Sequence, residues 1–265
     1  MCGTCGCEEN AMHDHDDGHT HDHEGAHTHS HGNDHGHDHS PHDDKRLKIE
    51  RAVLAKNDGY ASFNRGFFAG RGIFAVNLLS SPGSGKTTLL ERAIGDLARD
   101  MAVSVIEGDL ATDRDAARIR AAGAPVVQIN TGAVCHLDAH TVGHALEDLA
   151  PARGSVLFIE NVGNLVCPAM FDLGEHERIV LFAVTEGEDK PIKYPHMFAR
   201  ASLVLLTKVD LLPHLSFDVE SALGFAREVN PRAEVLRVSA RTGAGMTELY
   251  DWLRKRSEPV LGGVR

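Results

Sequence analysis

The segment Ser80-Ser81-Pro82-Gly83-Ser84-Gly85-Lys86-Thr87 decides the fold of this chain, because an apolar run precedes it and a helical pattern follows it. Its glycines let successive backbone amides point inward around phosphate oxygens, and the N-terminus of the following helix adds a partial positive charge. A lysine and a hydroxyl residue follow in the order that a phosphate-binding loop (P-loop) requires. The segment therefore predicts a nucleotide phosphate site between a strand and a helix.

The polar residues of this loop have separate expected roles. We expect Lys86 to reach the β- and γ-phosphates and Thr87 to ligate Mg²⁺. Ser80 stands where the usual pattern has its first glycine, so its backbone angles must suit a residue with a Cβ. The alternative, a glycine-rich turn without a ligand, leaves the order of lysine and threonine unexplained. The expected nucleotide contacts here are Gly83, Ser84, Gly85, Lys86, Thr87 and Thr88.

Short apolar runs alternate with amphipathic stretches on both sides of the P-loop. Such alternation indicates an α/β fold in which a mostly parallel sheet is flanked by helices on both faces. The expected strands are 73–79, 103–107, 126–129, 156–159, 179–184, 203–206 and 235–238, and the expected helices are 88–99, 114–121, 136–149, 217–229 and 246–255.

Two carboxylates follow strands whose ends are expected near the phosphates. Asp109 comes after the strand 103–107, and Glu160 ends the strand 156–159. Such an acid completes the magnesium site of P-loop enzymes. The string Glu160-Asn161-Val162-Gly163 resembles a DxxG switch with Glu for Asp, in which the amide of Gly163 senses the γ-phosphate. Solvated strand ends are the alternative for both carboxylates.

Base recognition is expected after the late strands. Thr207-Lys208-Val209-Asp210 resembles the NKxD element of GTPases with Thr for Asn. The Asp210 carboxylate would accept two guanine N–H groups, a contact that adenine cannot reproduce, and the stem of Lys208 would lie over the base. The loop containing Ser239 and Ala240 resembles the element that contacts guanine through its backbone. These features favour GTP over ATP, and an ATP-driven assembly factor is the disfavoured alternative.

Residues 1–44 differ in composition from the rest of the chain. They hold eleven of the 38 acidic residues and no Lys or Arg, so the formal charge of −11 belongs to them. The balanced remainder argues against nonspecific nucleic-acid binding, which needs a basic face. With almost nothing apolar, 8–44 cannot offset the entropy of ordering. We expect a disordered metal-binding tail at 1–44, a helical lead-in at 45–70 and the nucleotide-hydrolysing domain at 71–265.

The tail carries two kinds of candidate metal ligand. Cys2, Cys5 and Cys7 place three thiols within six residues, and removal of Met1 would add a terminal amine. A flat nitrogen and sulfur set suits Ni²⁺, whereas a tetrahedral thiolate site also suits Zn²⁺. Twelve of the eighteen histidines lie in residues 13–42, which indicates metal storage or buffering. A polar spacer is the alternative for this tract.

A second cluster of candidate ligands lies in the body of the chain. Cys135 and His136 are adjacent, and Cys167 follows the switch by four residues. Three ligands leave a metal open or let a second copy of the chain complete the shell. A lone cysteine is more often a small buried hydrophobe. His140 and His144 continue at helical spacing and are open as further ligands, with a solvated helix face favoured.

The environment expected for the chain is the cytoplasm. No apolar stretch approaches the ~20 residues that span a membrane, and the N-terminus lacks the pattern of a secretion signal. Five cysteines, three of them crowded together, suit thiolate chemistry in a reducing compartment. We expect no membrane and no nucleic acid among the partners.

Together these residues resemble the HypB family, SIMIBI-class GTPases that help insert nickel into [NiFe]-hydrogenase. The most specific stretches are 80–87, 130–139, 160–168 and 186–195, and the likeness extends over the Cys and His tail and nearly all of 70–256. We expect slow, magnesium-dependent hydrolysis of GTP to GDP and phosphate. The residues expected to act in it are Lys86, Thr87, Asp109, Glu160 and Gly163.

The resemblance also implies partners. It implies a homodimer that GTP promotes, with Cys135, His136 and Cys167 at the subunit interface binding nickel or zinc. Lys193 would reach nucleotide across that dimer. A zinc-bearing HypA-type nickel chaperone and the [NiFe]-hydrogenase large subunit are the implied partners.

Two other functions stay open. The urease-maturation GTPases share the P-loop class and can carry a histidine tract, but they hold metal through Cys-Pro-His rather than Cys135 and His136 with Cys167. The second is a nickel buffer whose nucleotide domain is only structural, which GTP turnover would separate from an enzyme.

Overall fold

The computed structural model describes residues 41–109, 113–132 and 134–264. The cluster Cys2, Cys5 and Cys7 and the histidines at positions 13–39 lie outside the described residues. The chain divides into two units, Met1–Ala52 and Val53–Arg265. The sheet and the P-loop belong to the second unit.

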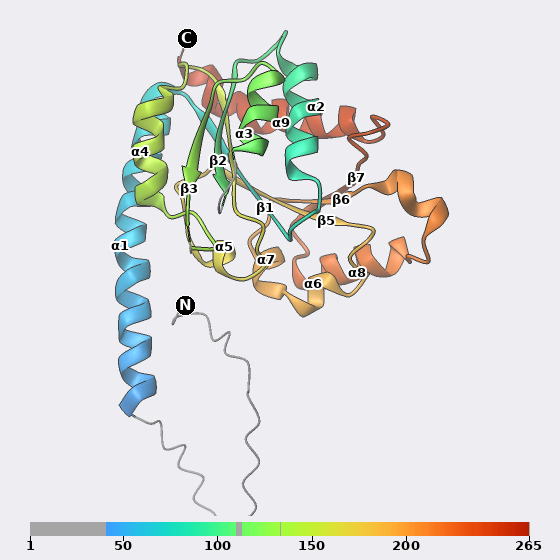
Figure 1. Ribbon diagram of the computed structural model, residues 1–265, viewed down its shortest axis with the longest axis horizontal. Coiled ribbons are helices and arrows are strands. Elements are labelled where there is room, and N and C mark those ends of the chain that lie inside the picture. The colour runs from blue at the N-terminus through green and yellow to red at the C-terminus, as the bar shows by residue number, and fades with distance from the viewer. Residues whose placement is uncertain (1–40, 110–112, 133, 265) are drawn as a thin grey trace, which may run out of the picture. The chain divides into compact units, whose positions relative to one another are not determined.

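One seven-stranded parallel sheet forms the centre of the second unit (Figure 1). Its strand order is β3-β2-β4-β1-β5-β6-β7, and every neighbouring pair is parallel. The predicted α/β fold is therefore confirmed. The strands are β1 (Phe74–Ser80), β2 (Val103–Asp109), β3 (Val126–Asn130), β4 (Val156–Glu160), β5 (Glu177–Ala183), β6 (Leu203–Thr207) and β7 (Glu234–Arg237).

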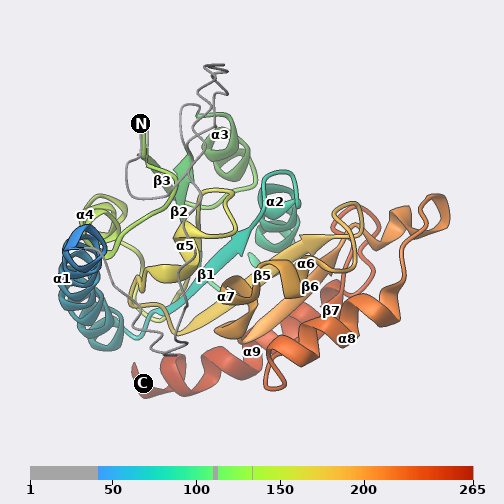
Figure 2. The same ribbon diagram turned by 90° about the horizontal axis from the view of Figure 1, so that it is seen from below.

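Helices connect the strands and cover both faces of the sheet (Figures 1 and 2). The short helices α5, α6 and α7 were not expected, because four or five residues are too few to show a periodic pattern. The helices are α1 (Pro41–Arg71), α2 (Lys86–Leu97), α3 (Arg114–Ala121), α4 (Ala139–Leu149), α5 (Cys167–Met170), α6 (Lys190–Lys193), α7 (Pro195–Ala199), α8 (Val219–Val229) and α9 (Met246–Leu261), with 3₁₀ turns η1 (Val209–His214) and η2 (Gly262–Val264).

The alternation of side chains along β1 explains how both faces are buried. Phe74, Val76 and Leu78 pack with α2 and α9 on one face, whereas Ala75 packs with α1 and α4 on the other. All seven residues of β1 are buried. Each large apolar side chain removed from water in this way stabilises the fold by about 1.5–3 kcal/mol.

Two helix starts differ from the expectation by more than two residues. The helix expected at 136–149 begins at Ala139, because Asp138 is extended and its side chain accepts a hydrogen bond from the amide of Thr141 at 2.8 Å. An Asp in this role ends the preceding loop and starts the helix. The lead-in expected at 45–70 is part of α1, which begins at Pro41, a residue type favoured at the first helical position. No described helix combines the length and hydropathy needed to cross a membrane.

Candidate nucleotide and metal sites

The P-loop connects β1 to α2 at the carboxyl edge of the sheet. Gly83 and Gly85 have φ angles of 75° and 98°, in the left-handed region that residues with a Cβ rarely adopt. Ser80 is the last residue of β1 and has no positive φ. Its hydroxyl accepts a hydrogen bond from Nζ of Lys86 at 2.8 Å, so serine at the usual glycine position holds the lysine.

Residues from four loops converge on one cavity of about 450 Å³ beside the P-loop. Thr87 and Thr88 at the start of α2 line it together with Asp109 at the end of β2. Glu160 and Gly163 reach it from the end of β4. The residues expected around the phosphates and magnesium therefore lie together. Others that line it are Pro82, Gly83, Ser84, Gly85, Lys86, Glu107, Gly108, Asp115, Arg118, Asn161, Val162 and Lys208.

Buried carboxylates give this cavity the donors that a hard cation needs. The hydroxyl of Thr87 donates to Oε1 of Glu160 at 2.8 Å. Among the described residues, Oε2 of Glu160 and Oε2 of Glu107 are buried without a hydrogen-bond partner. Mg²⁺ takes oxygen ligands of this kind, so the residues fit a magnesium ion. Glu107 was not expected here, and the only signal for it is an acid inside an otherwise apolar strand.

Burial shifts the protonation of the charged groups around the cavity. It raises the pKa of Glu107 to about 8, with a further contribution from Glu160. It also raises the pKa of Glu160 and lowers the pKa of Lys86, although these two opposite charges partly compensate one another. A bound cation would favour the ionised carboxylates.

The base-recognition motifs are attached directly to the P-loop. Nζ of Lys208 donates to the carbonyl of Gly83 at 2.6 Å, and the hydroxyl of Thr207 donates to the carbonyl of Ser84 at 2.7 Å. Asp210 lies in η1, and its Oδ1 accepts a hydrogen bond from Ser239 at 2.6 Å. Ala240 follows Ser239 after β7. The two motifs therefore meet, because β6 and β7 are neighbouring parallel strands.

Lys193 does not line the phosphate cavity of this chain. It is exposed at the end of α6, and its Nζ lies 2.6 Å from Oδ2 of Asp189. Glu186 is the residue of this region that contacts the P-loop: it accepts a hydrogen bond from the hydroxyl of Ser81 and forms an ion pair with Lys190 at 3.2 Å. Glu186 is not among the site residues expected from the sequence.

Cys135, His136 and Cys167 form one potential metal-binding group, whose ligand atoms all lie within 4.8 Å of one another. Cys167 begins α5, toward which the carboxyl ends of β2 and β3 point in Figure 1. The His136 ring stacks on Phe171 with centroids 4.0 Å apart. Its Nδ1 is buried with no hydrogen-bond partner in the described chain. Burial lowers the pKa of His136, which favours the neutral imidazole that binds metals.

Two contacts connect this group to the phosphate cavity. A Cβ built on Gly163 would lie 3.0 Å from Cα of Pro82, so the switch packs directly on the P-loop. Oδ1 of Asn161 accepts a hydrogen bond from the amide of Leu137 at 3.1 Å, one residue after His136. Residues 160–167 therefore contact the P-loop, bind the backbone next to His136 and include Cys167.

Two asparagines of helix α1 bind backbone atoms close to the metal-binding group. Oδ1 of Asn57 accepts from the amide of Ala139 at 2.9 Å. Nδ2 of Asn64 donates to the carbonyls of Ala139 and Leu173 at 2.8 and 3.0 Å. Both asparagines are buried. They fix the start of α4 and the chain after Phe171, so this part of α1 supports the group, whose ligands among the described residues all come from other segments.

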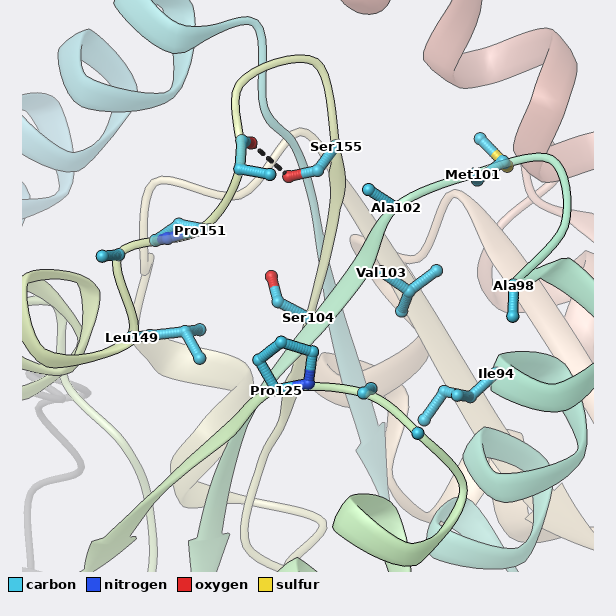
Figure 3. A pocket seen from close by; sticks show the side chains of 14 residues that line it. Ile94, Ala98, Met101, Ala102, Val103, Ser104, Pro125, Leu149, Pro151 and Ser155 are labelled. Carbon is cyan, nitrogen blue, oxygen red and sulfur yellow. Dashed lines mark hydrogen bonds between the residues drawn. The ribbon is translucent and has the colours of Figure 1, made fainter.

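Another cavity, of about 380 Å³, lies at the opposite edge of the sheet, where β2, β3 and β4 begin (Figure 3). Its lining is mainly apolar and includes Ile94, Val103 and Leu149. No charged residue lines it among the described residues. The P-loop cavity, in contrast, is lined by Lys86, Arg118 and Lys208. Cations favour phosphate binding, so the P-loop cavity is the better candidate for a nucleotide site.

Known proteins match the chain over the same region. A model of the CobW/HypB/UreG nucleotide-binding domain matches residues 74–237. The hydrogenase maturation factor HypB of Rhizobium leguminosarum bv. viciae is 60% identical over 210 residues, which cover 79% of this chain and 70% of that protein. HypB of Escherichia coli strain K12 is 55% identical over 209 residues, which cover 79% of this chain and 72% of that protein.

Solved structures agree with these matches. The crystal structure of HypB from Archaeoglobus fulgidus is 40% identical with a TM-score of 0.72, covering 77% of this chain and 100% of that one. The crystal structure of HypB from Helicobacter pylori in complex with nickel is 38% identical with a TM-score of 0.72, covering 77% of this chain and 96% of that one.

Proposed function

We propose, since this chain belongs to the HypB hydrogenase maturation factors of the CobW/HypB/UreG nucleotide-binding family, that it is a GTPase whose cycle controls the binding and release of nickel for [NiFe]-hydrogenase. The observation that carries this proposal is the short segment from Glu160 to Cys167. It lines the phosphate cavity at one end and supplies a metal ligand at the other.

Hydrolysis rests on positioning and charge rather than on a covalent intermediate. Thr87 and Glu160, with Asp109, would hold Mg²⁺, and Glu107 would lie beside them. The ion supplies charge neutralisation at the phosphates when bound. Lys86, which Ser80 holds at 2.8 Å, stabilises negative charge that develops on the phosphoryl oxygens. The contacts of Asp210 and Lys208 support guanine as the base.

The proposed control of nickel affinity rests on the contacts of the switch, residues 160–163. When the amide of Gly163 binds a γ-phosphate, its backbone shifts against Pro82, with which it is already in contact. The shift reaches Cys167 along the chain and His136 through Asn161 and Leu137. The affinity of Cys135, His136 and Cys167 for nickel or zinc thereby differs between the GTP and GDP states.

Assembly and storage complete the proposal. Val134, Val166 and Met170 expose apolar surface beside the metal-binding group, 45%, 52% and 39% of each residue respectively. Such surface supports a GTP-promoted homodimer, across which Lys193 would reach nucleotide. Cys2, Cys5 and Cys7 would capture nickel tightly, and the histidine tract would store it in the cytoplasm. A HypA-type chaperone and the hydrogenase large subunit would be the partners.

Lys86→Ala tests the hydrolytic part of the proposal. We expect phosphate release from GTP, measured with Mg²⁺, to fall to the uncatalysed level, because Lys86 is the cation held inside the P-loop. Lys255→Ala, an exposed lysine of α9, is the matched control and should retain full turnover. Wild-type turnover in Lys86→Ala would reject the P-loop as the hydrolytic site, and no GTP turnover in the wild type would reject a GTPase.

A further inference from the structure

A buried ion pair, Arg178 with Glu175, contacts residues 169–173, the end of α5 and the chain that follows it. Nε of Arg178 donates to Oε1 of Glu175, and the two side chains are only 7% and 3% exposed. The cost of removing two charges from water offsets most of the attraction within such a pair, so the pair is weak evidence for added stability. The other hydrogen bonds of the pair indicate what it holds in place.

The remaining donors of Arg178 are directed at this segment. Nη1 donates to the carbonyl of Ala169 at 3.1 Å, and Nη2 donates to the carbonyl of Phe171 at 2.9 Å. Oε2 of Glu175 accepts from the amide of Leu173 at 2.7 Å. The planar guanidinium presents its donors in a fixed fork, which a lysine does not reproduce. One rigid pair therefore binds the backbone of the segment from Ala169 to Leu173.

This segment is continuous with the metal-binding group. Cys167 begins α5, two residues before Ala169. The ring of Phe171 stacks on the ring of His136, with centroids 4.0 Å apart. Holding the carbonyls of Ala169 and Phe171 thus restrains both a thiolate ligand and the plane of an imidazole ligand. Ligands must lie within about 0.5 Å of their binding geometry, so the segment has to be fixed for the three ligands to share one ion.

Asn77 connects the ion pair to the other side of the metal-binding group. It is the register partner of Arg178 between β1 and β5, and its Nδ2 donates to Oε1 of Glu175 at 3.3 Å. Its Oδ1 accepts from Nδ2 of Asn161 at 3.4 Å. Asn161 in turn accepts from the amide of Leu137, beside the histidine ligand. One chain of side chains therefore binds backbone on both sides of the group.

On these contacts we propose that Arg178 and Glu175 are positioning residues for the group formed by Cys135, His136 and Cys167. They act through the backbone and the Phe171 ring rather than as ligands. This inference rests on the metal-binding part of the proposed function and does not depend on GTP hydrolysis. Loss of a group that orients metal ligands lowers metal affinity by about 10–100-fold.

Nickel binding by the full chain tests this role, with Cys2, Cys5 and Cys7 changed to serine. Absorption from thiolate-to-nickel charge transfer then reports only the thiols of the metal-binding group, and a buffer sets the free Ni²⁺ concentration. Arg178→Lys keeps the charge beside Glu175 but loses the fork. Its nickel dissociation constant should rise at least about tenfold, and its charge-transfer band should shift. GDP affinity should stay within about twofold, because neither residue of the pair lines the P-loop cavity.

Two further variants separate positioning from a general loss of stability. Glu175→Gln keeps an acceptor for Arg178 but loses the one for Leu173, so its nickel dissociation constant should rise at least about threefold. Leu253→Val shortens a buried side chain of α9 on the other face of the sheet. This control should lower the temperature of thermal unfolding and leave the nickel dissociation constant unchanged.

Unchanged nickel affinity in Arg178→Lys and in Glu175→Gln, with the charge-transfer signal present, would overturn the positioning role. An equal loss of affinity in Leu253→Val would assign the effect to stability and overturn the role as well. Absence of the signal before any of these changes would reject metal binding by Cys135 and Cys167, and the positioning role with it.

Discussion

The two halves of the sheet on either side of β1 prepare the site differently. On the side of β5, β6 and β7, the base-recognition residues bond to one another and to the P-loop: Asp210 accepts from Ser239, and Lys208 donates to Gly83. On the side of β2, β3 and β4, Glu107, His136 and Glu160 each keep a buried polar atom with no partner in the described part of the chain. The base side is preorganised, and the other side fits cations.

This difference indicates which side of the sheet would respond to the bound nucleotide. Hydrogen bonds that are already made hold a loop in one arrangement, so we expect the base side to bind a base without reorganising. Buried, unsatisfied carboxylates and an imidazole cost free energy until a cation binds. We therefore expect the cation side, which carries both residues 160–163 and Cys167, to change most between nucleotide states.

Glu160→Gln gives the largest expected effect and tests whether the cation side depends on magnesium. Removing this charge should lower magnesium-dependent GTP turnover by roughly 100-fold or more, because a ligand and its charge are lost together. Turnover against Mg²⁺ concentration measures it. GDP binding without Mg²⁺ should stay within about threefold, and Glu248→Gln, an exposed acid of α9, is the control. Full turnover in Glu160→Gln would remove this carboxylate from the site.

Glu107→Gln tests the burial of charge on the same side, in the magnesium-free protein. The folded pKa of Glu107 is about 8 against an unfolded value of 4.5. The stability that its neutral form provides is fully present below about pH 4.5 and is lost as the pH rises through about 8. Glutamine stays neutral, so the wild type should lose on the order of 3 kcal/mol more unfolding free energy than the variant between pH 5 and 8. Denaturant unfolding at several pH values measures this, and parallel curves would contradict it.

Asp210→Asn tests the base side. The amide should weaken GTP and favour a xanthine nucleotide, whose carbonyl replaces a guanine donor, with a swing of about 1–3 kcal/mol. Competition between GTP and XTP for binding measures the preference. Asp218→Asn, which keeps the capping role of that residue on α8, is the control. An unchanged base preference would remove Asp210 from the guanine pocket.

Ser239→Ala sharpens the claim that the base side is preorganised, and it gives the smallest expected effect. It removes the 2.6 Å hydrogen bond to Asp210 but leaves the carboxylate in place. GTP affinity should fall by about 0.5–1.5 kcal/mol without a change in base preference. Calorimetric binding of GTP and XTP measures both quantities. An effect as large as that of Asp210→Asn would show that Ser239 contacts the base itself.

The sequence predicts the sheet well because its five inner strands, β2, β4, β1, β5 and β6, are mainly buried and mostly apolar. The edge strands β3 and β7 are less buried but keep short apolar runs. Strand positions differ by one or two residues at most ends, since hydrogen bonds rather than hydropathy set the last residue of a ladder. The short helices α5, α6 and α7 have too few residues for a period. Proline at one of their first two positions, at Pro168, Pro191 and Pro195, was the usable signal.

Only part of the site can be predicted from the sequence. Strings such as the P-loop and the segment from Thr207 to Asp210 are local, so they are readable without the fold. The bond from Leu137 to Asn161 and the ion pair of Glu186 with Lys190 depend on where loops meet after folding. Glu107 looks like a solvated strand residue until its neighbours bury it.

Nucleotide control of nickel is tested most directly by the nickel affinity of the Cys135, His136 and Cys167 group in two nucleotide states. In the full chain with Cys2, Cys5 and Cys7 changed to serine, absorption from thiolate-to-nickel charge transfer arises only from Cys135 and Cys167. We expect the nickel dissociation constants in GDP and in a nonhydrolysable GTP analogue to differ at least about fivefold, and Cys167→Ala to remove the signal while nucleotide binding persists. Identical nickel isotherms in the two nucleotide states would contradict GTP control of this site.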